Sequence, residues 1–107
     1  MFARVLEMET KPGKARELCS VIEEKGVPIL KGFPGLLDVF CLIPEEIADS
    51  VIAISFWETR ETAEKYHHEA FRKVAEIYHP FLEGLIQVRG CDVPVSTGYR
   101  AKFAKAS

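Results

Sequence analysis

The side chains best suited to chemistry lie together in the segment ISFWETRETAEKYHHEAFRKV, residues 54–74. It holds an indole at Trp57, a phenol at Tyr66 and neighbouring imidazoles at His67 and His68. An imidazole in an apolar pocket is suited to proton transfer, because burial lowers its pKa and keeps it neutral near pH 7. A phenol can donate a hydrogen bond to a ligand oxygen, and an indole can form a flat wall. The segment therefore predicts a site that binds a planar molecule and moves a proton.

The two histidines are not equivalent if this segment is helical. We predict a helix over residues 60–79, with Thr59 as its N-cap. Its sheet-facing arc on a helical wheel consists of Ala63, Tyr66, Ala70, Phe71, Val74, Ile77 and Tyr78. His67 falls inside this arc and His68 at its flank, so His67 should face the sheet or a cavity above it. A kink near His68 would exchange their roles.

Each of these residues also has a purely structural interpretation. His67 could be a core histidine bonded to a backbone carbonyl or a carboxylate, and Trp57 could serve only as packing at a strand end. Tyr66 and Tyr78 are ordinary residues for an amphipathic helix. The sequence leaves both interpretations open.

Arg4 is a charged residue within a predicted strand, residues 2–9. A buried guanidinium needs a partner, because an uncompensated charge in the interior is costly. Glu7, Asp38 or an acidic ligand could supply that partner.

Sequence motifs for cofactors and metals are absent. The chain has neither a GxGxxG nor a GxxxxGK[ST] loop, no G-x-S-x-G elbow, and no HxE combined with CxxC. Adjacent helical residues point about 100° apart, so His67 and His68 cannot bind one metal from a single helix face. We therefore expect no cofactor and no metal.

The composition indicates one small globular domain. The chain has 107 residues, of which 48% are hydrophobic and 28% charged. Its net charge of −2 argues against a nucleic-acid partner. Three widely spaced cysteines do not form a disulfide framework, and no apolar run is long enough to cross a membrane. The N-terminus lacks the apolar core of a signal peptide, so a cytoplasmic location is expected.

The order of predicted elements defines the fold. Strands are expected at 2–9, 36–43, 51–57 and 85–93, and helices at 13–25 and 60–79. This βαββαβ order predicts an α+β ferredoxin-like plait, a four-stranded antiparallel sheet with two main helices on one face. The plait would span residues 1–93 and be followed by a tail at 94–107.

Three finer features are expected within these elements. Gly26 should end the first helix, because glycine is frequent just beyond helix C-termini. Residues 27–31 should form a short extra turn. Gly90 should mark a bulge in the last strand.

Two strands are apolar on both sides. In the strand at 36–43, Asp38 is the only charge, and the strand at 51–57 has none. Two helices can cover only one face, so we expect a homodimer through the sheet faces, with Ala53 on the outer face and the tail near the partner.

The chain resembles the antibiotic biosynthesis monooxygenase-like family of dimeric α/β barrels. The resemblance covers roughly residues 2–93. It is carried by the Lys-Pro-Gly turn after the first strand, by Gly-Phe-Pro-Gly before the second, and above all by FWETRETAEKYHHEAF.

This resemblance implies a cofactor-free monooxygenase acting on a planar phenol or quinol-like substrate. His67 would be the base and Tyr66 the hydrogen-bond donor. The expected ligand pocket consists of Trp57, Phe71, Tyr78, His68 and Arg4. The alternative is a non-enzymatic ligand-binding or stress-related dimer.

Haem degradation, known in other members of this family, is disfavoured. Such relatives use an Asn on the first strand and a ligand His on the second helix. Those positions align here with about Leu6 and Ala75, so haem iron would lack an axial imidazole.

Overall fold

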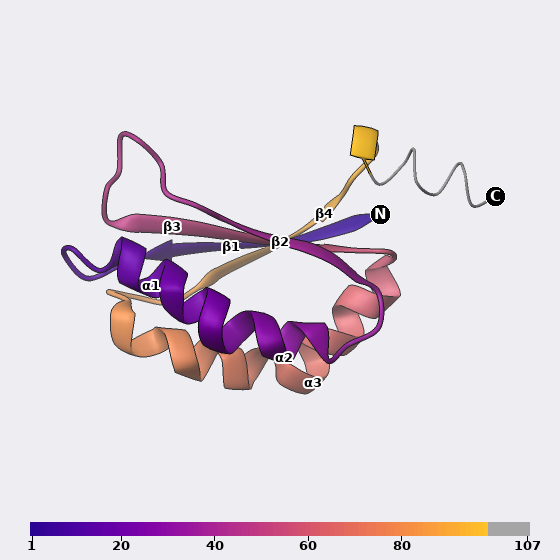
Figure 1. The fold of residues 1–107 in the computed structure, drawn as a ribbon, viewed down its shortest axis with the longest axis horizontal. Helices are drawn as coiled ribbons and strands as arrows, with labels where there is room; N and C mark the ends of the chain where they lie inside the picture. Colours follow the sequence, from indigo (N-terminus) through magenta and orange to yellow (C-terminus); the bar gives the residue numbers. More distant parts are fainter. Residues whose placement is uncertain (99–107) are drawn as a thin grey trace.

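The computed structural model describes residues 1–98 of the chain and shows one sheet with helices on one of its faces (Figure 1). The strands are β1 (Phe2–Glu9), β2 (Leu36–Leu42), β3 (Ser50–Trp57) and β4 (Gln87–Asp92). The helical segments are α1 (Ala15–Val21), the π-helical η1 (Ile22–Gly26), α2 (Val27–Lys31), α3 (Arg60–Tyr78) and the 3-10 turn η2 (His79–Phe81).

The four strands pair antiparallel in the order β2-β3-β1-β4. This confirms the predicted α+β ferredoxin-like plait. The central strands are β3 and β1. Burial alternates from residue to residue along β3, as is typical of a strand that packs on one face. The capping box that Thr59 and Thr62 form fixes the start of α3, as expected for a polar N-cap.

Strand β3 decides which residues lie beneath the helices. Val51, Ala53, Ser55 and Trp57 are buried, whereas the alternating residues Ile52, Ile54 and Phe56 are only half-buried. The expectation that Ala53 lies on the outer face is therefore wrong. Both sides of this strand are apolar, so alternation alone did not show which side the helices cover.

The first helix continues through Gly26. The segments α1, η1 and α2 follow one another without a break, and Gly26 has right-handed helical angles, with φ −77°. The prediction that Gly26 ends this helix is wrong, whereas the extra turn expected at residues 27–31 is present as α2. Gly26 is buried because the side chain of Tyr78 lies against its backbone, and a β-carbon there would overlap the Tyr78 hydroxyl.

Gly90 does not form the expected bulge. It pairs with Arg4 in the regular register of β1 and β4. A β-carbon at Gly90 would lie 2.8 Å from the Phe2 ring and 3.2 Å from Nη1 of Arg4, so the glycine leaves room for these side chains. The register instead shifts in β2, between Leu36 and Asp38.

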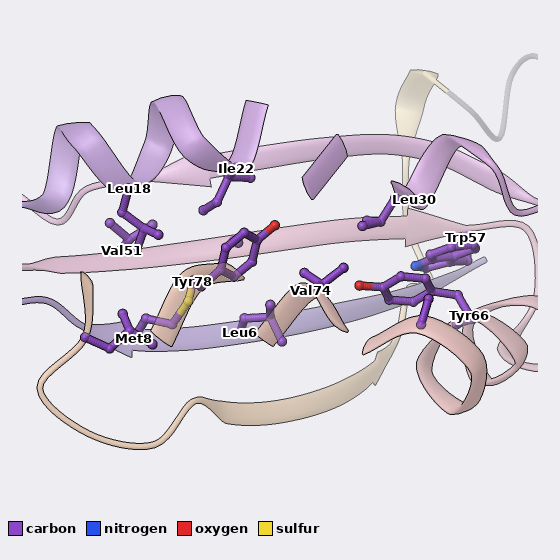
Figure 2. Packing of buried hydrophobic residues seen from close by; sticks show 14 of the residues in the cluster. Leu6, Met8, Leu18, Ile22, Leu30, Val51, Trp57, Tyr66, Val74 and Tyr78 are labelled. Atoms are coloured by element: carbon purple, nitrogen blue, oxygen red, sulfur yellow. The ribbon is translucent and has the colours of Figure 1, made fainter. Parts of the chain in front are cut away.

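The core lies between the sheet and the helices, as Figure 2 shows. Its side chains that are almost completely inaccessible include Trp57, Met8, Leu18, Ile22, Val51 and Val74. α3 contributes Ala63, Tyr66, Ala70, Val74 and Tyr78 to it, which confirms the predicted sheet-facing arc at these positions. The core thus anchors the two tyrosines of α3.

The opposite face of the sheet is not covered by any helix of residues 1–98 (Figure 1). Its apolar side chains include Phe40 and Leu42, which are 47% and 46% exposed, and Phe40 contacts Phe56 with ring centroids 5.4 Å apart. Most of the tail, residues 99–107, lies outside the described part of the chain, so its expected contact with a partner stays a prediction.

None of the helices within residues 1–98 has the length and apolarity to span a membrane.

Candidate functional site

A small internal cavity lies between the helices and the sheet. Its volume of about 20 Å³ is enough for about one water molecule. The lining comes from η1, α2 and α3 and from the strands β1, β2 and β3: Arg4, Leu6, Ile22, Val27, Leu30, Val39, Ala53, Ile54, Ser55, Tyr66, Phe71, Val74 and Tyr78. Most of these side chains are apolar, so the few polar ones determine the chemistry of the cavity.

Tyr66 is held in the cavity wall by two aromatic contacts. Its ring stacks on Trp57 with centroids 5.2 Å apart, and Phe33 meets it edge-on at 5.5 Å. Figure 2 shows Tyr66 extending from the Trp57 end of the sheet toward Val74. The indole Nε1 of Trp57 donates to Ser55 Oγ at 2.9 Å, which fixes the ring behind Tyr66. Trp57 itself does not line the cavity.

Burial keeps both cavity tyrosines protonated. Desolvation raises the pKa of Tyr66, and the nearby positive charge of Arg4 opposes this only in part. Desolvation also raises the pKa of Tyr78, together with Tyr66 and Cys41. Both phenols are therefore hydrogen-bond donors at neutral pH.

His67 is half-buried beside the cavity and not in its lining. Its ring stacks on Phe71 with centroids 4.4 Å apart and an interplanar angle of 16°, and Phe71 lines the cavity. The buried Nδ1 of His67 has no hydrogen-bond partner. Desolvation and then Arg4 lower the pKa of His67, while Glu64 raises it, so the imidazole is neutral near pH 7. A neutral imidazole can accept a proton.

His68 is exposed on α3 and is not part of the cavity lining. α3 is one continuous α-helix from Arg60 to Tyr78, so the alternative in which a kink exchanges the two histidines does not apply. Of the residues expected in the pocket, the structure brings together Arg4, Tyr66, Phe71 and Tyr78. Trp57 and His67 are not in the lining, but Trp57 stacks on Tyr66 and His67 stacks on Phe71, both of which line the cavity.

Arg4 reaches the cavity from the helix-facing side of β1. Its Nε is buried and has no hydrogen-bond partner. Of the three possible partners, Glu7 does not pair with Arg4, because Glu7 lies on the other face of β1 and pairs with Arg89 at 3.1 Å. Asp38 is likewise on the outer face, opposite Phe56. The guanidinium of Arg4 instead lies 5.4 Å from the centre of the Phe2 ring.

A groove adjoins the cavity between η1 and the edge strand β2. It has a volume of about 300 Å³ and shares Ile22, Val27 and Val39 with the cavity lining. Cys19 and Cys41 both line it, and each thiol influences the pKa of the other. Sequence reasoning missed this pair, because nothing in their spacing shows that a helix position and a strand position will meet.

The family comparison adds to this geometry. The family model for antibiotic biosynthesis monooxygenases matches residues 1–77. The chain belongs to this family. Its fold is that of the cofactor-independent monooxygenases of the family, and within residues 1–98 no cluster of three or more His, Cys, Asp or Glu could hold a metal ion.

Solved structures of this monooxygenase family have the same fold as the protein. A putative antibiotic biosynthesis monooxygenase from Bordetella bronchiseptica is 14% identical with a TM-score of 0.75, covering 88% of this chain and 97% of that one. SnoaB, a cofactor-independent oxygenase from Streptomyces nogalater, is 14% identical with a TM-score of 0.74, over 91% and 96% of the two chains.

A third similar structure contains a ligand. The monooxygenase from the gene ActVA-Orf6 of Streptomyces coelicolor, in complex with nanaomycin D, is 15% identical with a TM-score of 0.74 and covers 89% of this chain and 88% of that one. At such identities the likeness establishes the fold alone. No curated protein matches the chain.

Proposed function

We propose that this protein is a monooxygenase that oxidises a planar phenol or quinol without a cofactor, in the cavity under α3. One observation carries the proposal: an apolar cavity in a fold of this family has a phenol donor, Tyr66, and a guanidinium, Arg4, in its wall. His67, a neutral base with an unpartnered Nδ1, lies directly behind that wall.

The chemistry needs a proton acceptor and a dry, oriented site. Substrate binding would have to extend the cavity past Phe71 to His67, whose Nδ1 then takes the phenolic proton. The electron-rich anion then reacts with dioxygen at a ring methylene. The methylene and O₂ become a carbonyl and water, so one oxygen atom enters the product and the substrate supplies the electrons. Tyr66 donates a hydrogen bond to the substrate oxygen, and Trp57 holds Tyr66 in that orientation.

A substrate of this size must enlarge the cavity. A volume of about 20 Å³ holds water and not an aromatic ring system. The groove between η1 and β2 offers the space, because its lining is continuous with the cavity at Ile22, Val27 and Val39. We therefore place the entrance at this groove, and binding would separate η1 from β2.

We further propose that the protein acts as a homodimer through the outer face of the sheet. That face presents Phe40, Leu42, Ile54 and Phe56 without a helix to cover them. A second copy would bury these side chains, and obligate interfaces of this kind bury more than about 2,000 Å² in total. The active cavity lies on the opposite side of the sheet, so each subunit would carry its own site.

Oxygen uptake tests the proposed activity. The substrate is a polycyclic phenol with an oxidisable methylene, such as 1,8-dihydroxyanthrone, with its spontaneous oxidation subtracted. Wild type should consume O₂ and form the quinone in equal amounts, and His67→Gln should lower the rate by about a hundredfold or more. His68→Gln, which changes the exposed neighbour, is the matched control and should retain the rate. Tight binding without O₂ uptake would contradict the enzyme proposal and favour a ligand-binding protein.

A further inference from the structure

Arg4 carries a positive charge that nothing in the described chain neutralises. Among the ion pairs of residues 1–98, none includes Arg4. Glu7 pairs with Arg89 and Glu64 with Arg60 at 3.5 Å. Asp92, diagonal to Arg4 across the β1–β4 pair, is exposed and forms no ion pair with it. Arg4 is only half-exposed, and its Nε has no access to solvent and no partner.

The surroundings hold Arg4 in place by apolar contacts. The Phe2 ring lies under the guanidinium of Arg4 and also 5.7 Å from that of Arg60. Gly90, across the strand pair, leaves the space that Nη1 occupies. Such contacts orient a guanidinium but supply no acceptor for its N–H groups.

The buried Nε of Arg4, which has no hydrogen-bond partner, indicates what kind of ligand group would bind here. A carboxylate binds a guanidinium with two parallel hydrogen bonds, and the edge formed by Nε and one Nη suits it. A neutral carbonyl or a single phenolic oxygen offers one oxygen atom to both donors and brings no negative charge. Since Arg4 lines the cavity, a ligand group reaching its Nε would come from a molecule bound there.

We infer that the substrate of this site is a planar aromatic acid whose carboxylate pairs with Arg4. This inference rests on the proposed function, because it assigns a substrate class to the same cavity. The carboxylate at Arg4 anchors the ring system, and the phenolic oxygen then lies toward Tyr66 and His67. Arg4 is thus a specificity-determining residue.

A matched pair of probes tests the inference in binding alone, without oxygen. The probes are 1-hydroxy-2-naphthoate and 1-hydroxy-2-naphthamide, which differ in charge and hardly in shape. Trp57, the single tryptophan of the chain, stacks on Tyr66 of the cavity wall, so its fluorescence reports occupancy. Wild type should bind the carboxylate about tenfold to a hundredfold more tightly than the amide, as a charge-assisted hydrogen bond implies.

Two arginine variants separate a specific contact from net charge. Arg4→Gln should reduce the carboxylate-to-amide ratio to about one. Arg60→Gln removes the same charge from an exposed position and should keep the wild-type ratio. A wild type that does not discriminate, or an Arg4→Gln variant that still does, would overturn the inference. Loss of the ratio in both variants would also overturn it, because general attraction would then explain the preference.

The melting temperature provides a second measurement, because replacing an arginine that stabilises the fold would lower it. Arg4→Met replaces the unpaired charge with an apolar side chain of similar length. Its melting temperature should rise above that of wild type, while carboxylate preference is lost. A fall in melting temperature would show that Arg4 serves the fold and would contradict the inference. None of these binding measurements depends on turnover, so they remain decisive even if oxygen uptake fails.

Discussion

The side chain of Tyr78 lies against the backbone of Gly26, in the position that a β-carbon of residue 26 would occupy. The contact joins the C-terminal end of α3 to the π-helical segment η1. It explains why a glycine occurs within a continuous helix, where it weakens helix formation. The contact also fixes Tyr78 in the cavity wall.

Gly26→Ala should therefore destabilise the protein by about 1–3 kcal/mol, because the new methyl group overlaps Tyr78. Urea unfolding measures the change. Tyr78→Leu removes the overlapping hydroxyl and should make the alanine less harmful in the double variant than in the single one. Additive effects of the two substitutions would contradict direct contact.

The neutral state of His67 should make stability depend on pH. Its pKa is lowered in the folded protein relative to the ordinary value of 6.5, so the unfolded state takes up a proton that the folded state resists. This contribution to the free energy of unfolding is fully present above about pH 6.5. It decreases as the pH is lowered from 6.5 toward the lower pKa that His67 has in the folded protein. His67→Asn should flatten this dependence in urea titrations between pH 7.5 and 5.5, whereas His68→Asn retains His67 and should behave as wild type. An unchanged slope in His67→Asn would show that His67 does not cause it.

The two histidines should also differ at fixed pH. His67→Ala removes the ring stacked on Phe71 and should cost about 1 kcal/mol at pH 7.5, whereas His68→Ala should stay within about 0.5 kcal/mol. Thermal melts of both variants measure this difference. Equal losses would contradict the placement of the two side chains on α3.

The thiol pair beside the cavity should react slowly. Burial raises the pKa of Cys41 to about 11, and burial raises that of Cys19 as well. At pH 8 the thiolate fraction of Cys41 is then roughly a hundredfold below that of an ordinary thiol. Since the thiolate is the reactive form, Cys41 should react slowly. Iodoacetamide labelling followed by mass spectrometry should show slow modification in the folded protein and fast modification in urea. Equal rates in both conditions would contradict the burial of this pair.

The proposed dimer predicts a difference between two faces of the same sheet. Phe40→Glu places a charge on the uncovered face and should convert the dimer to monomer or unfold it. Val88→Glu is the control, since Val88 is 39% exposed on the helix-facing side of β4. Sedimentation at micromolar concentration distinguishes the two. A folded wild-type monomer would contradict the proposal.

Much of the architecture could be predicted because it depends on local patterns. The arc of Tyr66, Val74 and Tyr78 follows from the 3.6-residue period of a helix, and the strand order follows from the βαββαβ sequence of elements. Ala53 could not be placed, since a strand that is apolar on both sides gives no direction.

The remaining errors involve contacts between distant parts of the chain. The local sequence at Gly26 predicts a helix end, because nothing in it shows that Tyr78 needs the space beside this glycine. The sequence around Gly90 likewise predicts a bulge, because it does not show that the side chains of Phe2 and Arg4 fill the space beside this glycine. The candidate site was predicted in part: Arg4, Tyr66, Phe71 and Tyr78 meet at the cavity, but its lining from η1, α2 and β2 depends on tertiary packing.

The most direct test of the proposed oxygenation in the cavity under α3 is the incorporation of ¹⁸O from ¹⁸O₂ into the quinone formed from 1,8-dihydroxyanthrone. Wild type should produce a quinone with one labelled oxygen, and Ala53→Leu, which fills the cavity, should lose this product while remaining folded. Unlabelled product, or labelled product formed equally fast by Ala53→Leu, would contradict oxygenation in this cavity.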